Sequence, residues 1–400
     1  MRLHLVAVVV CFWLPTFARA DLKSWTLKPE VVSVGSVSDR VLWNFRPGLG
    51  LKWKDSFWGS DQFSFAAAAR FRGDVQANFV STQRPYEFKI DESYLQWQGN
   101  RASAALGWQK YTWGDSAFFD GVDFLNPRDL SEPLYDDDDA IKIPVPSVNF
   151  QYLGDNTIFQ TVLTLKAERT PVDRDIQGIG IKTPAERGWL SAIEVGGKAG
   201  GLLKSGWDLN GYILSHFERV PQFVTVLKPF TEAELELSEP RVFTLGLTAT
   251  QSVGDFVFRG EFAQHSNRAV PDQGAIERKI ASQAVFHATV DATAFTNIVT
   301  TFEVWREWWS AKSNARFRGD SALLGIRLQK PFWDGRLEPS AGYLASPDRA
   351  ESWGFVKLDV KTFESSQISI EGHWAKTSTG RVLARRGLKN LIRSSVSYQF

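Results

Sequence analysis

The sequence predicts an all-β protein, a transmembrane antiparallel up-and-down β-barrel. Three observations predict it. Short segments in which apolar and polar residues alternate recur along the whole chain. Aromatic residues are abundant, with 16 Trp and 29 Phe, although the mean hydropathy is only -0.21. The chain closes on Phe400, at the end of one such segment. Strands of this barrel class turn one row of side chains to lipid and the other to water, with aromatic girdles at both interfaces.

The first twenty residues are typical of a secretory signal. Arg2 precedes an apolar run over 5–17, and Ala18 and Ala20 supply the small residues of a cleavage site. We therefore expect a signal peptide over 1–20 and one barrel over 21–400. The single cysteine, Cys11, lies within the predicted signal, so the mature barrel would hold no disulfide and no thiolate metal site.

The candidate strands follow one another closely. A weak segment at 25–36 comes first. A clear one at 62–72 places Phe63 and Phe71 on the face expected to meet lipid, with Arg70 and Arg72 on the face expected to meet the lumen. The other strands are expected at 42–53, 86–98, 102–112, 147–153, 157–168, 190–199, 205–217, 240–252, 256–263, 281–292, 298–309, 319–330, 335–345, 352–362, 368–374 and 392–400.

The connections between these strands alternate in length. Short ones, such as 154–156 and 331–334, are expected in the periplasm, and long ones are expected outside. Counting back from a last strand that descends to the periplasm requires the weak segment 25–36 as a strand. The prediction is then 18 strands, with 16 as the alternative. The long connections lie at 113–146, 169–189, 218–239 and 266–280.

Charges of both signs fall on the inward rows of the predicted strands. They could pair across the wall and stiffen it, or they could create a transverse field that orients a passing solute. A barrel of 16 to 18 strands usually leaves water inside, so an open lumen is expected. The inward charges are Arg70, Arg72, Glu92, Arg259, Glu261, Glu303, Glu307, Arg327, Lys357, Asp359 and Glu371.

The longest connection, 113–146, combines turn formers with apolar residues that need burial, so we expect it to fold into the barrel. One interpretation is a constriction loop whose charged residues set the size and charge preference of a pore. The other is a plug in which the apolar residues stabilise the barrel while the acids stay solvated. The candidate constriction residues of the loop are Asp115, Asp120, Asp123 and Arg128.

Several motifs in and around this loop resemble an uncharacterised proteobacterial family of porin-like outer-membrane barrels. They are Gly107-Trp108-Gln109-Lys110-Tyr111-Thr112-Trp113-Gly114-Asp115, Asn126-Pro127-Arg128-Asp129, and the acidic run Asp136 to Asp139 before Ile143-Pro144. In the first motif the family carries Gly-Arg-Gln and Trp-Gly-Glu. This chain has Gln109-Lys110 in place of Arg-Gln, and Asp115 in place of Glu. The resemblance covers roughly 40–170. It implies a porin-like barrel and assigns no substrate.

Other functions find little support in the sequence. Lys and Arg number 46 against 45 Asp and Glu, so no basic field for nucleic acid exists. His265 and Ser266 resemble the pair of a barrel phospholipase, but neighbours on a strand point to opposite faces. The acids 136–139 lack the spacing of a calcium loop and suggest a solvated rim. We expect no enzyme activity, no metal and no cofactor.

The function predicted from the sequence is a channel that passes a small or amphiphilic solute across the outer membrane. One alternative is a lipid or hydrocarbon conduit, or an export accessory barrel, beginning at a Trp108, Trp113, Phe118 and Phe119 cluster. Less favoured alternatives are a phospholipase and a soluble periplasmic β-protein. Expected partners are outer-membrane lipid and lipopolysaccharide, a second copy of the chain in a homo-oligomer, and the barrel assembly machinery, which would recognise the terminal strand through Val396, Tyr398 and Phe400.

Overall fold

The structure is a computed structural model. It describes residues 25–36, 43–56, 62–73, 75–76, 86–114, 121–128, 142–165, 181–182, 191–219, 222–226, 234–270, 280–295, 297–310, 320–347, 351–363, 366–376 and 391–398. Among these residues there is no helix long and apolar enough to cross a bilayer.

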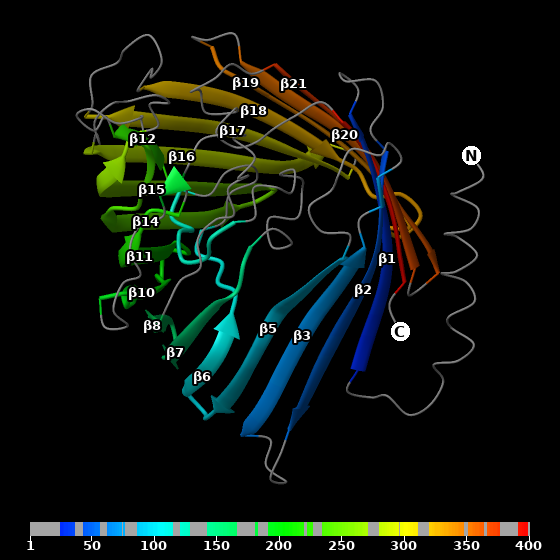
Figure 1. Ribbon diagram of the computed structural model, residues 1–400. Coiled ribbons are helices and arrows are strands. Elements are labelled where there is room, and N and C mark those ends of the chain that lie inside the picture. The colour runs from blue at the N-terminus through cyan, green and yellow to red at the C-terminus, as the bar shows by residue number, and fades with distance from the viewer. Residues whose placement is uncertain are drawn as a thin grey trace.

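One antiparallel sheet closes on itself into a barrel (Figure 1). The sheet has 19 described strands. Strands β3 and β4 both pair with β2, one after the other, and occupy one position in the wall, so 18 strand positions surround the barrel. The strands are β1 (Trp25–Ser36), β2 (Trp43–Ser56), β3 (Phe63–Gly73), β4 (Val75–Gln76), β5 (Tyr86–Gln98), β6 (Ala102–Gln109), β7 (Val145–Leu153), β8 (Thr157–Thr164), β10 (Glu194–Leu202), β11 (Asp208–Phe217), β14 (Arg241–Val253), β15 (Phe256–Ala269), β16 (Ile280–Phe295), β17 (Ile298–Trp309), β18 (Ser321–Gln329), β19 (Leu337–Ala345), β20 (Ser352–Phe363), β21 (Ser366–Lys376) and β22 (Leu391–Tyr398).

Strand β1 closes the barrel, because it pairs with β2 on one side and with β22 on the other. Trp25 lies opposite Trp53 of β2, and Val31 lies opposite Val396 of β22. Blue β1 accordingly runs beside the red and orange C-terminal strands in Figure 1. The weak segment is therefore a full strand, and both the predicted fold class and the count of 18 are confirmed. A closed wall has no open sheet edge, which is what a lipid environment requires.

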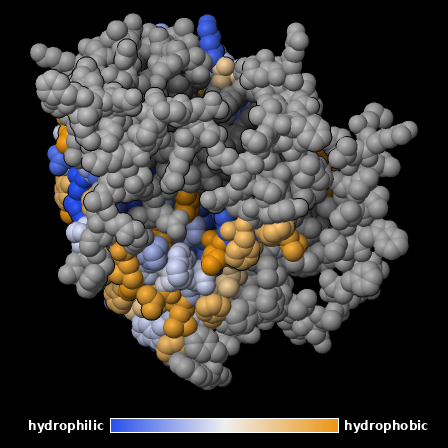
Figure 2. Space-filling view, in the orientation of Figure 1, coloured by the Kyte–Doolittle hydropathy of each residue, from blue (hydrophilic) through white to orange (hydrophobic). Residues whose placement is uncertain are grey.

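The two rows of each strand differ in burial as the alternation predicts. In β17, Phe302 and Val304 are exposed on the outside, whereas Glu303 and Trp305 are buried on the inside. In Figure 2, orange apolar residues lie beside pale and blue polar ones on the coloured part of the surface. Lipid would cover this outer row, so the exposure of large apolar side chains follows from the barrel's surroundings.

Short turns connect the strands at the end assigned to the periplasm. The turn between β18 and β19 holds Trp333, Asp334 and Gly335 at φ values of 49°, 55° and 77°, in the left-handed region. At the other end, two long connections contain a separate small sheet that the alternation did not predict. It consists of β9 (Ile181–Lys182), β12 (Gln222–Val226) and β13 (Glu234–Ser238).

Candidate functional site

The loop between β6 and β7 folds into the barrel and packs against the inner wall. Its side chains share one buried cluster with inward side chains of β7, β8, β11 and β15. Removing these apolar groups from water stabilises the inward position by about 1.5–3 kcal/mol for each large side chain. The cluster comprises Tyr111, Trp113, Val122 and Leu125 from the loop, with Phe124 at its edge, and Val145, Val162, Tyr212, Leu214 and Ala263 from the wall.

Two inward glycines make room for the loop. A Cβ on Gly196 of β10 would lie 2.8 Å from Cη2 of Trp113, and a Cβ on Gly246 of β14 would lie 2.7 Å from Cγ1 of Val122. Both glycines lie in the row of their strand whose other side chains face the lumen. The missing side chain at Gly196 leaves space for the Trp113 indole.

Asn126 joins the two ends of the loop. Its Oδ1 accepts a hydrogen bond from the Tyr111 backbone N–H at 2.7 Å. Its Nδ2 donates to the carbonyls of Gln109 at 3.1 Å and Ile143 at 2.9 Å. The next residue, Pro127, accepts from the Ile143 N–H at 2.8 Å. The Asn-Pro pair is thus a hydrogen-bonded junction of three backbone segments, and satisfying these buried groups stabilises the loop.

Asp123 lies at the centre of a buried charge cluster. Its carboxylate contacts Lys142 Nζ at 2.8 Å and Arg128 Nη2 at 3.4 Å. Lys142 also donates to Thr112 Oγ1 at 2.9 Å. Asp123 and Arg128, which the sequence analysis named as candidate constriction residues, contact each other here. However, Asp123 is only 1% exposed, so its charge is neutralised within the loop rather than presented to solute or solvent.

Glu261 connects the wall to the loop directly. This inward residue of β15 is 3% exposed, and its Oε2 accepts a hydrogen bond from the Gly121 N–H at 2.8 Å. Gly114, at φ 107°, passes so close that a Cβ there would lie 2.8 Å from Glu261 Oε1. Only glycine fits such a backbone at such a distance. One of the predicted lumen acids therefore positions the loop.

A buried ion pair holds the loop from the neighbouring hairpin. Arg219, just after β11, binds both oxygens of Glu194 at 3.0 and 2.7 Å. The same guanidinium donates to the backbone carbonyls of Phe124 at 3.0 Å and Leu125 at 2.6 Å. Glu194 is fully buried, and its Oε1 also accepts from the Phe217 N–H at 2.7 Å. This planar, bidentate arrangement is one that lysine could not reproduce.

Aromatic and cationic groups surround Phe124. Its ring lies 4.6 Å from the His265 ring and 5.9 Å from the His216 ring, with the Arg268 guanidinium 5.4 Å away. Arg268 is in turn paired with both oxygens of Glu218 at 2.8 and 2.5 Å. A cation at such a ring face adds to the apolar contact. The ring is thereby fixed against β11 and β15.

Other predicted lumen charges lie on β3 and β5. Arg70 contacts Asp91 at 3.1 Å, and Lys110 contacts the same carboxylate at 3.4 Å. Glu92 accepts a hydrogen bond from the Lys110 N–H at 3.1 Å. The pairing of β3 with β5 shifts register at this point, so the adjacent Asp91 and Glu92 both turn inward. Arg72 lies in β3, but its side chain is outside the described part of the structure.

The remaining predicted charges face the lumen from β15 to β21, away from the described loop residues. Each has a local partner, which supports the interpretation that pairing stiffens the wall. Arg259 pairs with Asp291, Glu303 with His287 at 3.1 Å, Glu307 with Gln283 at 2.8 Å, Lys357 with Asp359 at 3.2 Å and Glu371 with His373 at 2.9 Å, while Arg327 lies 5.9 Å from the Phe355 ring centroid.

An apolar cluster covers part of this opposite wall. Trp353 and Phe355 of β20 stack near each other at 5.3 Å, and His373 of β21 lies 5.9 Å from Trp353. Six residues make up the cluster, which we call the aromatic wall: Val285, Trp305, Leu323, Leu344, Trp353 and Phe355.

Some predicted positions fall outside the described residues: Asp115, Asp120, Phe118, Phe119, 136–139 and Phe400. Of the assembly residues, Val396 pairs with Val31 and Ile368, and Tyr398 lies opposite Ser366. The sequence analysis placed Trp108 and Trp113 in one cluster, and this prediction is wrong. Trp108 is 47% exposed on the outer row, whereas Trp113 is buried inside the barrel.

The structure offers no support for the His265 and Ser266 dyad. His265 is fully buried on the inner row and binds Thr244 Oγ1 at 2.8 Å, while the Ser266 hydroxyl donates to the Phe243 carbonyl. The alternating strand thus separates the two groups, as predicted. Within the described residues, no group of three metal-ligating side chains comes together.

Several residues that hold the loop were not singled out from the sequence: Asn126 as a junction, Glu194 with Arg219, and the glycines Gly196 and Gly246. The bonds of Arg219 to Phe124 and to Glu194 join positions 95 and 25 residues apart along the chain. Local alternation carries no information about such contacts. The available signal was the placement of glycine on inward rows of β10 and β14.

Comparison with solved structures finds the same fold in outer-membrane proteins. OccK8 (OprE) of Pseudomonas aeruginosa superposes with a TM-score of 0.60 at 10% identity, over 94% of this chain and 98% of that one. OccAB2 of Acinetobacter baumannii gives 0.58 at 9% identity, over 94% and 97%. P. aeruginosa OpdK with vanillate gives 0.55 at 10%, over 94% and 97%. No family model and no curated protein matches the sequence. The likeness therefore shows the fold.

Proposed function

We propose that this protein is an outer-membrane channel that passes a small or amphiphilic solute between periplasm and exterior. One observation carries the proposal: the long loop between β6 and β7 packs inside a closed barrel of 18 strands, against β8, β10, β11, β14 and β15. A barrel of this size is wide enough for a water-filled lumen, and an inward loop narrows it. The proposal includes localisation in the outer membrane.

The chemistry of the two inner sides supports an amphiphilic solute. The loop side carries the partly exposed Arg70, at 28% side-chain exposure, and Lys110, which contacts the same Asp91 carboxylate, while Arg128 pairs with Asp123 in the loop. The opposite side carries the aromatic wall. One structural neighbour, OpdK, was solved with vanillate. A solute with an anionic group and an apolar ring would match both sides of this lumen.

Planar-bilayer recording of the purified protein tests the proposal. We expect discrete conductance steps, and a variant lacking 121–128, a segment of the loop that packs on the inner wall, should give larger steps because less of the loop narrows the lumen. Competition by an aromatic carboxylate should reduce the current at the unmodified channel more than a neutral sugar does. Recordings without steps at any voltage, from protein shown to be folded, would contradict a channel.

A lipid or hydrocarbon conduit is the second candidate, and the aromatic wall is the observation that favours it. A conduit needs an apolar track through the barrel, and six clustered apolar side chains from five strands provide part of one. Transfer of a fluorescent lipid between vesicles discriminates the two functions. A channel for soluble solutes would conduct ions without moving the lipid.

A further inference from the structure

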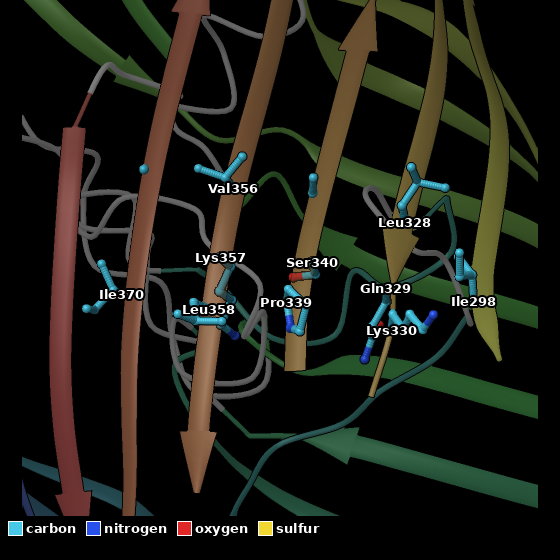
Figure 3. A pocket seen from close by; sticks show the side chains of 12 residues that line it. Ile298, Leu328, Gln329, Lys330, Pro339, Ser340, Val356, Lys357, Leu358 and Ile370 are labelled. Atoms are coloured by element: carbon cyan, nitrogen blue, oxygen red, sulfur yellow. The ribbon is translucent and has the colours of Figure 1, made fainter. Parts of the chain in front are cut away.

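The outer wall has a hollow over β17 to β21 with a volume of about 510 Å³. Figure 3 shows its labelled side chains spread over these neighbouring strands. It lies toward the turn between β18 and β19, at the end assigned to the periplasm. Its lining includes large apolar side chains from four strands: Ile298, Leu328, Val356, Leu358 and Ile370.

The hollow arises because small residues stand between large ones on the outward rows. Across the sheet, Leu328 lies opposite Ala341, Ala341 opposite Val356, and Val356 opposite Gly372. Ala341 and Gly372 form the floor of the hollow. Leu328 and Val356, which are 44% and 52% exposed, project beyond it. The neighbouring Pro339 extends the floor toward the periplasm, opposite Leu358.

An apolar hollow on a lipid-facing surface is filled by hydrocarbon. Water in it would lack hydrogen-bond partners, and an empty space would forfeit the dispersion contacts of its lining. A flexible acyl chain can enter a groove between side-chain ridges, where it gains contacts that a flat wall does not offer.

Charged and aromatic groups mark the level of the headgroup beside the hollow. Lys330 lines it and holds its ammonium 5.0 Å from the Phe332 ring centroid. In the following turn, Trp333 is 74% exposed, which is typical of an aromatic side chain at a membrane interface. Arg336 in this turn is also exposed, so two basic side chains stand against one acid, Asp334. This balance favours an anionic phosphate.

We propose that this hollow is a binding site for a glycerophospholipid of the periplasmic leaflet. One acyl chain lies over Ala341 and Pro339, between Leu328 and Val356, and the phosphate meets Lys330. The site lies on the outside of the wall and is independent of solute passage through the lumen. It gives lipid a preferred position on the outer surface of β17 to β21.

Photo-crosslinking in reconstituted vesicles tests the site. The probe is phosphatidylglycerol with a diazirine in one acyl chain, and the labelled peptides are identified by mass spectrometry. We expect labelling to concentrate on β18 to β20. Ala341→Phe fills the floor and should reduce labelling there roughly tenfold, since several methylene contacts are lost. Ala288→Phe, at an outward position of β16 beyond the hollow, should leave it unchanged.

Charge reversal tests the headgroup contact. Lys330→Glu should lower labelling at β18 to β20 about fivefold, the effect of one basic group near a membrane surface. The control is Lys204→Glu, an exposed lysine in the short turn between β10 and β11, which should have no effect at this place. Even labelling around the wall would overturn the proposal, as would an absence of labelling on β18 to β20 beside labelled neighbouring strands, which would assign this face to a second copy. Conductance is measured separately and does not enter this test.

Discussion

The two sides of the barrel interior are built differently. On the β8 to β15 side, wall and loop are fitted to each other through inward glycines, a shared apolar cluster, a hydrogen bond that Glu261 accepts from the loop and hydrogen bonds that Arg219 donates to it. On the β16 to β21 side, the wall has its own apolar cluster, and its charges pair within a strand or with the neighbouring strand. The first side therefore fixes the position of the loop, whereas the second packs its apolar side chains against one another in a cluster of its own. Substitutions on the two sides should differ accordingly.

The largest effect is expected from Arg219→Leu. Breaking the pair leaves Glu194 buried without its partner and removes two bonds to the loop carbonyls. We expect a loss of about 3–5 kcal/mol in the free energy of unfolding. Urea titration in detergent, followed by tryptophan fluorescence, measures it. Arg101→Leu is the control, since its pair with Asp155 is exposed and should contribute less than about 1 kcal/mol. Equal losses of unfolding free energy in both variants would contradict the inference that Arg219 holds the loop.

Asn126→Ala should be the next most damaging change. It leaves the Tyr111 N–H and the carbonyls of Gln109 and Ile143 without this partner. The expected cost is about 3 kcal/mol, and the freed loop should make single-channel currents noisier. Gln96→Ala is the control, because its side-chain amide only bonds the Gln98 side chain at the exposed surface. Quiet currents together with unchanged stability would show that the junction does not hold the loop.

Gly246→Val should act on the loop by crowding. The new side chain meets Val122, so the loop must shift or the wall must distort, at a cost of roughly 2 kcal/mol. The conductance should change with it. Gly260→Val is a matched control on the adjacent strand β15, because a Cβ there has nothing within 4 Å. Similar conductance changes in both variants would contradict a specific contact between wall and loop.

Phe355→Leu probes the opposite side and should have the smallest effect on stability, roughly 1 kcal/mol. Its expected signature is functional. Block of the current by an aromatic carboxylate should weaken, because losing this buried ring, which is 2% exposed, loosens the packing of the aromatic wall, while the open-channel conductance stays close to that of the unmodified protein. Block that is unchanged in strength would show that the packing of the aromatic wall does not shape the solute path.

The alternating rows made most of the barrel predictable. The segments 86–98 and 298–309 match β5 and β17, and even the weak 25–36 is a strand, because each pattern is local and repeats every two residues. The inward turn of both Asp91 and Glu92 was not predictable, since it depends on a register shift against β3. The contact of Arg219 with Phe124 could not be predicted either, because it joins two separate loops that meet only in the folded barrel.

A designed disulfide tests the inward position of the loop most directly. A Cβ on Gly246 would lie 3.5 Å from the Cβ of Val122, within the spacing that a disulfide requires. The only native cysteine of the chain is Cys11. Val122→Cys with Gly246→Cys should form the bond under mild oxidation, seen as a mobility shift that reductant reverses, and conductance should be retained. Val122→Cys with Leu247→Cys, on the outward row, should stay reduced. Failure of the first pair to crosslink in folded protein would contradict a loop packed on the inner wall.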